Sequence, residues 1–273
     1  MDYVDAYEQE QITFEAKSKA PADLDALVKS NAFKTGTTIC GVIAKDCVVL
    51  AADMRATMGS TVSDKHCFKL HRIYCNLWCA GAGVAADLDH ITMNLSAELH
   101  VFARQIGSLP RVETCVTRLC NQLFKYQGFL KTALIVGGVN PTGEMSLWYV
   151  SPDGYSHSLP YMAMGSGGLY ANSMLEAGYK KDMDREQAKE LCADAIQAGV
   201  MNDLASGTGV NLVVLSLNDP WNPVLTRKYR MPVLGDKVPY TRPPFTLGQT
   251  KVLKEIVREI RPFKPDQICE FLS

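Results

Sequence analysis

The run Thr35-Gly36-Thr37-Thr38-Ile39-Cys40 decides how the chain is organised. Residues before it are polar and acidic, whereas apolar, β-branched sequence begins directly after it. Cutting the bond between Gly36 and Thr37 would free the α-amine of Thr37, so that one residue would carry both a hydroxyl nucleophile and an amine base. An α-amine has a reference pKa of about 8, which makes it a usable proton acceptor near neutral pH. Glycine has no Cβ, so the Thr37 hydroxyl can approach the preceding carbonyl.

The sequence after this run has the β-branched composition of paired strands. Residues 38–44 and 47–53 are separated by Lys45-Asp46, which predicts a hairpin. Further strands are expected over residues 62–70, 73–80, 132–139, 145–150, 155–164 and 210–217.

Other segments carry apolar residues at intervals of three and four, the pattern of helices with one buried face. We expect helices over residues 84–106, 112–127, 169–178 and 185–205. A turn at Gly81-Ala82-Gly83 should open the first, and Asp184 with Gln187 should cap the last. Groups of strands therefore alternate with pairs of helices. This order predicts antiparallel sheets covered by helices, an α+β fold.

Charge and composition exclude several classes of protein. The formal net charge is −1, from 28 basic and 29 acidic residues, and it gives no electrostatic reason to expect a nucleic-acid or membrane partner. No apolar run reaches the roughly 18 residues that span a bilayer. The first residues lack the basic and apolar regions of a secretory signal. We therefore expect a soluble, intracellular protein.

The nine cysteines are scattered and lie mostly in apolar sequence. None of them shows the C-x-x-C spacing of a zinc site. Small buried side chains in a reducing compartment explain them better than a disulfide framework or a metal site.

Proline is frequent from Asp219 onward, where it supplies eight of the 55 residues. It resists compact helix and sheet structure and favours an extended arm, interrupted by a short helix over residues 252–260. Such an arm cannot bury enough surface by itself. Its aromatic residues therefore indicate docking on another protein; they are Trp221, Tyr229, Tyr240, Phe245 and Phe271.

Over residues 35–218 the chain resembles a known family, the proteasome beta subunits. The start at Thr37 is similar to the mature start of the trypsin-like, beta-two-type members. Further motifs follow in the family's order; they are Ala51-Ala52-Asp53-Met54-Arg55-Ala56-Thr57, Phe68-Lys69-Leu70-His71, Ala80-Gly81-Ala82-Gly83-Val84-Ala85-Ala86-Asp87, Met164-Gly165-Ser166-Gly167 and Asp203-Leu204-Ala205-Ser206-Gly207. The resemblance implies a four-layer α/β/β/α sandwich, the N-terminal-nucleophile hydrolase fold. It also implies a propeptide over residues 1–36, a peptidase domain over 37–218 and an arm over 219–273.

The same resemblance implies a threonine endopeptidase made as a self-processing precursor. Thr37 would be the nucleophile once Gly36–Thr37 is cut. Lys69, paired with Asp53, would favour deprotonation of its hydroxyl. The sequence leaves open whether Lys69 or the Thr37 amine takes the proton. Further groups would orient the amine and a water and donate to the oxyanion; they are Ser166, Asp203, Ser206 and the backbone N–H of Gly83.

Substrate contacts follow from the resemblance as well. The backbone around Thr57 and Gly83 would hold an extended peptide as an added strand. The side-chain pocket would be lined by Ala56, Cys67, His71, Gly81, Ala85 and Asp89. Gly81 would leave room at its base, and Asp89 would face a Lys or Arg side chain and favour cleavage after basic residues. Alternatively, Asp87 and Asp89 only favour the positive end of the helix dipole.

The implied partners are polypeptide substrates and other proteasome alpha and beta subunits in stacked rings, with the arm embracing a neighbouring subunit. The expected location is the cytoplasm and nucleus, and neither a metal nor an organic cofactor is implied. Two other interpretations remain. A subunit with only a scaffold role would lose members of the catalytic set, which is intact here. A self-processing amidase acting on a small molecule would not need the long arm.

Overall fold

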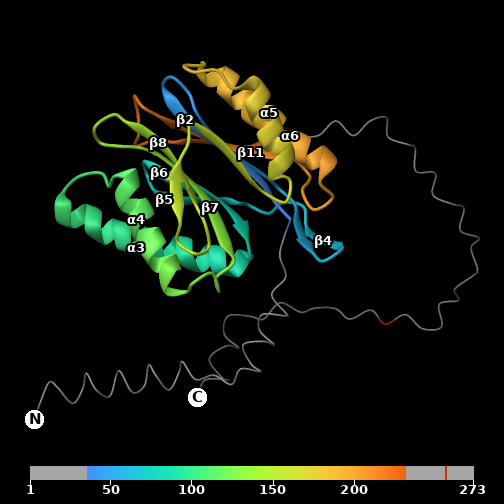
Figure 1. The fold of residues 1–273 in the computed structure, drawn as a ribbon, viewed down its shortest axis with the longest axis horizontal. Helices are drawn as coiled ribbons and strands as arrows, with labels where there is room; N and C mark the ends of the chain where they lie inside the picture. Colours follow the sequence, from blue (N-terminus) through green and yellow to red (C-terminus); the bar gives the residue numbers. More distant parts are fainter. Residues whose placement is uncertain (1–35, 232–255, 257–273) are drawn as a thin grey trace, which may run out of the picture. The chain divides into compact units, whose positions relative to one another are not determined.

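The computed structural model describes residues 36–231 and residue 256. The expected propeptide before Gly36, the helix over 252–260 and most of the expected arm therefore lie outside the described residues, as does Cys269. The described part is α+β, as the sequence predicts, and is built on two five-stranded antiparallel sheets (Figure 1).

The first sheet carries the residues that follow Thr37. Its strand order is β10 (Tyr161–Gly165), β1 (Thr38–Ile43), β2 (Cys47–Asp53), β11 (Val210–Ser216) and β12 (Val224–Arg230). The hairpin expected at Lys45-Asp46 is confirmed, because β1 and β2 pair directly across it. Both strands are buried on both faces, which explains their almost unbroken apolar sequence.

The second sheet has the strand order β5 (Leu70–Tyr74), β6 (Leu77–Gly83), β7 (Thr132–Val139), β8 (Met145–Val150) and β9 (Ser156–Ser158). A separate small hairpin joins β3 (Ala56–Met58) to β4 (Thr61–Asp64). The helices are α3 (Ala85–Ile106), α4 (Val112–Lys125), α5 (Gly168–Gly178) and α6 (Arg185–Asn202).

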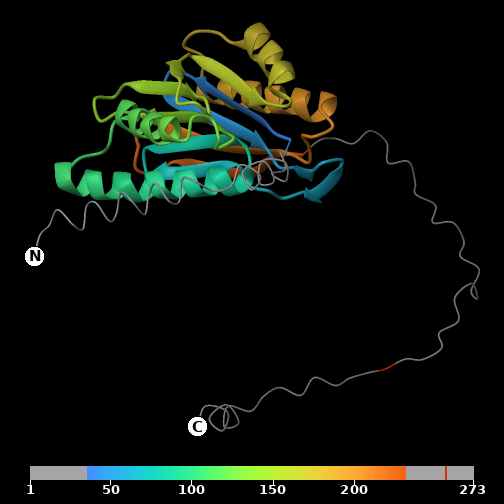
Figure 2. The same ribbon diagram turned by 60° about the horizontal axis from the view of Figure 1, so that its bottom comes forward.

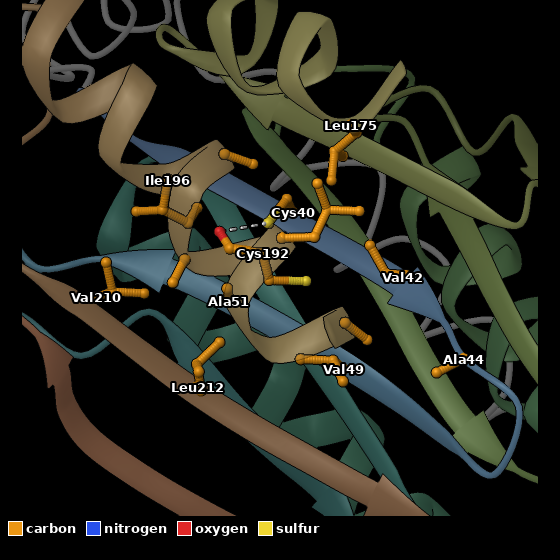
Figure 3. Close-up of a cluster of buried hydrophobic side chains, with 14 of the residues drawn as sticks. Cys40, Val42, Ala44, Val49, Ala51, Leu175, Cys192, Ile196, Val210 and Leu212 are labelled. Atoms are coloured by element: carbon orange, nitrogen blue, oxygen red, sulfur yellow. Dashed lines mark hydrogen bonds between the residues drawn. The ribbon is translucent and has the colours of Figure 1, made fainter. Parts of the chain in front are cut away.

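Three buried clusters hold the elements together in four layers. Ile39 and Leu50 of the first sheet pack with Ile135 of the second, so the two sheets face each other. A further cluster joins the outer face of the first sheet to α5 and α6, and Figure 3 shows Leu175 and Ile196 among its members. The third cluster joins the second sheet to α3 and α4. Figure 2 shows the helices on the two outer faces of the sheets.

The cysteines behave as small core side chains. Of the eight that the structure describes, six are buried, and none forms a disulfide. The Cys40 thiol donates to the carbonyl oxygen of Cys192 at 3.7 Å (Figure 3). Burial raises the pKa of the Cys79 thiol to about 12, so this thiol stays protonated at neutral pH.

The structure corrects several element predictions. The strand expected over 155–164 divides into β9 and β10, which lie in different sheets, and Pro160 between them has no N–H for a ladder. The strand expected over 62–70 is interrupted, because the His66 N–H turns back to the Asp64 carboxylate at 2.8 Å. Two helices also end earlier than expected, α4 at Lys125 and α6 at Asn202.

The turn expected at 81–83 is wrong, since these residues continue β6. They pair with Leu134, Ala133 and Thr132 of β7, and the helix begins only at Ala85. The small residues at 81 and 83 are explained by close neighbouring atoms rather than by a turn. A Cβ on Gly83 would lie 1.9 Å from the Lys131 carbonyl oxygen, and its φ of 137° favours glycine.

The sheet also continues beyond residue 218, where the sequence ended the folded domain. Strand β12 pairs with β11 at the edge of the first sheet. Two of the prolines that suggested an arm, Pro220 and Pro223, lie in the turn before this strand, and the strand begins with the apolar residues Val224 and Leu225. No residue of β12 is buried, and charged side chains protect a sheet edge from pairing with another chain, so its mostly polar sequence fits an edge strand.

Candidate active site

Thr37 lies directly before β1 and is only 2 % exposed. Asp53 closes β2, the neighbouring strand, and Lys69 precedes β5 of the facing sheet. The two sheets therefore bring together residues that are far apart in the sequence.

A buried ion pair adjoins the Thr37 hydroxyl. The Lys69 Nζ lies 2.7 Å from Asp53 Oδ1, and the two residues are 5 % and 0 % exposed. The same Nζ donates to Thr37 Oγ1 at 3.0 Å and to the Gly36 carbonyl oxygen at 2.8 Å. The positive charge thus touches both the candidate nucleophile and the carbonyl that it would attack.

Asp53 is fixed by backbone donors from three segments. Thr38 N–H donates to Oδ1 at 3.0 Å, while the N–H groups of Arg55 and Gly207 donate to Oδ2 at 3.1 and 3.0 Å. A buried carboxylate needs such partners as well as an opposite charge. Asp53 therefore both balances Lys69 and ties β1, β2 and the segment after α6 together.

Every polar atom around the Gly36–Thr37 bond has a partner. Thr37 Oγ1 donates to the Gly36 carbonyl oxygen at 2.8 Å, and the Gly36 N–H donates to Thr57 Oγ1 at 3.0 Å. The Thr37 N–H donates to Ser166 Oγ at 3.0 Å. The space is tight, because a Cβ on Gly36 would lie 2.0 Å from the Ala205 Cβ.

A hydrogen-bonded group of three hydroxyls and one carboxylate adjoins the Thr37 N–H. The Ser166 and Ser206 hydroxyls donate to Asp203 Oδ2 at 2.5 and 2.7 Å, and the Thr38 hydroxyl donates to Ser206 at 2.7 Å. Burial alone would raise the pKa of Asp203. The hydrogen bonds from the two serines and the Ala205 N–H, with the nearby Lys69 charge, outweigh it and lower that pKa.

Two hollows open beside Thr37. The larger, about 620 Å³, is lined by Gly36, Thr37, Thr57, Gly59, Ala82, Gly83, Lys131, Ala133, Pro152, Gly165, Ser166 and Ala205. Its volume is in the range of ligand sites. It contains Gly83, the expected oxyanion donor, together with Thr57.

All six residues expected to form the side-chain pocket border the second hollow. It is lined by Thr37, Ala56, Cys67, Phe68, Lys69, His71, Gly81, Ala85, Leu88 and Asp89. The His71 Nδ1 lies 3.7 Å from Asp89 Oδ1. Burial lowers the pKa of His71 and outweighs the opposite effect of Asp89, so the ring is neutral at pH 7.

Sequence reasoning missed several contributors to this site. The hydroxyls of Thr38 and Thr57 were given no role, although both residues stand in the quoted motifs. The Arg55 side chain was also overlooked, and it donates to the Leu204 carbonyl oxygen at 2.9 Å. An arginine in the run that carries Asp53 is the one feature that pointed to it.

The described residues hold no group of three or more His, Cys, Asp or Glu side chains that could bind a metal ion. Within the same part of the chain, no helix is both long and apolar enough to cross a membrane.

Comparison with known proteins supports a single assignment. Residues 33–215 match the family described as "Proteasome subunit". The chain is 44 % identical over 228 residues to the "Probable proteasome subunit beta type-2" of Schizosaccharomyces pombe, covering 82 % of each chain. It is 42 % identical over 239 residues to the "Proteasome subunit beta type-7" of Dictyostelium discoideum, covering 87 % of this chain and 86 % of that one. The "Proteasome subunit beta type-2" of Saccharomyces cerevisiae is 39 % identical over 237 residues, 87 % of this chain and 89 % of its own.

Proposed function

The chain belongs to the proteasome beta-subunit family, and from this premise we propose that it is a catalytic, trypsin-like subunit made as a self-processing precursor. It is a threonine peptidase of a stacked-ring core that contains alpha and beta subunits. The finer statements, that Thr37 becomes the nucleophile and that cleavage follows basic residues, are proposals supported by the geometry of the site.

One observation carries the proposal. The Thr37 hydroxyl lies between the Lys69 Nζ, at 3.0 Å, and the Gly36 carbonyl oxygen, at 2.8 Å. A nucleophile, a charge that favours its deprotonation and a carbonyl to attack are therefore held together in a buried place.

The first reaction is cleavage of the Gly36–Thr37 bond. Thr37 Oγ1 bonds to the Gly36 carbonyl carbon, and the hydroxyl proton is taken up by a base of the site. The carbon–nitrogen bond then breaks, and the Thr37 nitrogen receives a proton and becomes a free amine. Water hydrolyses the resulting ester, which releases the carboxylate of Gly36 and restores the hydroxyl.

The mature site repeats this chemistry on polypeptide substrates. The carbonyl before the cut takes the place of Gly36 beside Lys69, with the Gly83 N–H as the proposed oxyanion donor. Either Lys69 or the new Thr37 amine accepts the hydroxyl proton, and the Asp203 chain orients the amine and a water.

Specificity is assigned to the pocket that contains Asp89. This carboxylate and the neutral His71 border the pocket beside Thr37, and a Lys or Arg side chain would gain a charge-assisted hydrogen bond there. Gly81 and Leu88 lie side by side in the lining of this pocket. A Cβ on Gly81 would be only 2.8 Å from the Leu88 side chain, so a glycine at residue 81 avoids this clash.

The domain organisation is part of the proposal. Residues 1–36 form the propeptide, the peptidase domain begins at Thr37, and the residues after β12 form the arm that docks on a neighbouring subunit. We propose the cytoplasm and nucleus as the location.

The test is to compare Thr37→Ala with Thr37→Ser in the assembled particle. Thr37→Ala should leave residues 1–36 attached and remove cleavage after basic residues, because no hydroxyl remains. Thr37→Ser should retain both reactions in part. Intact mass and N-terminal sequencing report processing, and basic fluorogenic peptides report turnover. A Thr37→Ala particle that still starts at residue 37 and cuts these peptides would overturn the proposal and favour a scaffold role.

A further inference from the structure

Two segments of the chain meet next to Asp53. One is the end of β2 with Met54 and Arg55, and the other is the loop of residues 203–207 that follows α6, here called the 203–207 loop. The Met54 N–H donates to the Gly207 carbonyl oxygen at 3.1 Å, and the Gly207 N–H donates to Asp53 Oδ2 at 3.0 Å. These bonds fix the end of the loop next to Asp53.

The Arg55 side chain reaches the middle of the same loop. Its Nη1 donates to the Leu204 carbonyl oxygen at 2.9 Å. Its guanidinium also lies against Gly207, where an added Cβ would be 2.2 Å from Cζ. A glycine is therefore required at residue 207 for the arginine to hold this position.

The other bonds of the loop hold Ala205 and Ser206. The Ala205 N–H and the Ser206 hydroxyl donate to the Asp203 carboxylate, and the Thr38 hydroxyl donates to Ser206. The Leu204 side chain is 93 % exposed and contributes no packing. A charged donor makes a stronger hydrogen bond to a carbonyl than a neutral donor does, and the planar guanidinium adds contact with the glycine. Arg55 thus holds the Leu204 backbone from outside the loop.

Leu204 lies between Asp203 and Ala205, and both of these residues contact the reacting bond or its partners. Asp203 accepts the Ser166 hydroxyl, which in turn accepts the Thr37 N–H. Ala205 is the wall against which Gly36 packs. A shift of the 203–207 loop would therefore move the hydroxyl chain and the wall together.

Resting on the proposed function, we propose that Arg55 is a positioning residue for both self-processing and turnover, and that it acts through the 203–207 loop. It touches neither Thr37 nor the substrate pocket in the contacts described. We expect its effect on the rate of the chemical step, because no residue of the 203–207 loop lines the pocket proposed to bind the substrate side chain.

The experiment uses assembled particles carrying Arg55→Ala, Arg55→Lys, Gly207→Ala or the Arg55→Ala/Gly207→Ala pair, with Arg118→Ala as the control. Arg118 lies on α4 and pairs with Glu98 on α3, away from the loop. Processing is read as the fraction of chains that retain residue 36, and turnover as kcat and KM on a basic peptide.

Loss of Arg55 should lower kcat by about tenfold with KM changed by less than about twofold, since small misplacements of this kind act on the chemical step. Arg55→Lys should recover part of the loss, because it keeps a charged donor but not the flat contact. Gly207→Ala should resemble Arg55→Ala, since the new methyl group displaces the guanidinium. The double variant should be no slower than about the slower single variant, as expected for two changes that break one contact.

An unchanged kcat in Arg55→Ala, or a double variant in which the two losses multiply, would overturn the proposal. If Arg55→Ala does not assemble, Arg55→Lys and Gly207→Ala decide the same question. Thr37→Ala is measured in parallel. If it is inactive while the Arg55 variants cleave at the wild-type rate, only the positioning role is rejected. If the Thr37→Ala particle is active, the proposed function is rejected as well.

Discussion

The two groups of side chains around the Gly36–Thr37 bond are anchored differently. Asp53 ends the buried strand β2, Lys69 directly precedes β5, and the two form a buried charge pair at 2.7 Å. Ser166 and Asp203 lie on segments outside the strands and helices, and Ser166 is exposed. The buried pair is held by the two sheets themselves, whereas the second group depends on contacts such as that of Arg55 with Leu204.

This difference indicates a division of tasks. Removing one partner of a buried ion pair leaves an uncompensated charge, which is far more costly than losing a hydrogen bond at a surface. The Lys69 charge, which we propose acts on the Thr37 hydroxyl, is therefore held firmly by the two sheets. Ser166 and Asp203, which we propose orient the Thr37 nitrogen, depend instead on single side-chain contacts.

The largest effect is expected from the buried pair. Lys69→Ala should slow processing and turnover by roughly 10⁴-fold, the scale seen when a member of a catalytic unit is removed. Precursor retention and peptide cleavage in the assembled particle measure it. Lys189→Ala is the matched control, because that lysine pairs with Glu186 at 2.8 Å on the surface of α6. Equal rates for the Lys69 and Lys189 variants would contradict the comparison.

A smaller effect is expected from Gly36→Ala. Its Cβ would need the space of Ala205, and the Gly36 carbonyl would move away from Lys69. We expect processing about 100-fold slower, since misplacing a reacting group by about 1 Å costs this much. The rate of appearance of chains that begin at Thr37 measures it. Gly143→Ala is the control for loss of a glycine elsewhere: it lies in an exposed turn before β8, where its φ of 86° confines the strain of an alanine to that turn. Processing of the Gly36 variant at the wild-type rate would contradict this prediction and show that Ala205 moves aside without shifting the Gly36 carbonyl.

Asp203→Asn should cost less, about tenfold in kcat, because an amide keeps part of the hydrogen bonding. The pKa of Asp203 is lowered, so the carboxylate stays ionised throughout the range above its ordinary value. Its stabilising contribution is complete above that value and is lost only as the pH falls through the still lower folded-state pKa. The ratio of wild-type to variant rates should therefore stay constant between about pH 5 and 8. A ratio that changes within this range would assign a different ionisation to Asp203.

The same comparison explains what the sequence could predict. Strand and helix positions around Thr37 follow from periodicity, and the residue types at Asp53, Lys69, Ser166 and Asp203 follow from the family resemblance. Local patterns failed where a contact across the fold decides the structure. Gly83 suggests a turn until the Lys131 carbonyl is seen beside it, and the polar strand β12 is recognisable only once β11 offers an edge.

Arg55 illustrates the same limit for the site. A charged residue after a buried strand suggests a solvated side chain, and nothing nearby in sequence indicates its partner, Leu204, which is 149 residues away. The fit of the guanidinium on Gly207 is a matter of backbone shape, which residue types do not encode individually. The family resemblance implied the Lys69–Asp53 pair, but neither it nor the local sequence indicated the Arg55 contact that anchors the exposed Leu204.

The smallest effect concerns the pocket, which lies beside both groups. Asp89→Asn should lower kcat/KM for peptides with arginine before the cut by about fivefold relative to leucine, because an exposed charge is worth about 1 kcal/mol.

The pH dependence of this preference tests the same carboxylate. The titratable residues around the pocket are Asp89 on α3, and Cys67, Lys69 and His71 near β5. Burial lowers the pKa of His71, so its ring gains a charge only when the pH falls below the ordinary histidine range. The preference for arginine should therefore be complete at pH 7 to 8 and decline toward pH 5 in the wild type, because His71 then offsets Asp89 at 3.7 Å. In Asp89→Asn and in His71→Gln the preference should not change with pH. If it declines equally in all three particles, the charge that selects basic residues lies outside this pocket.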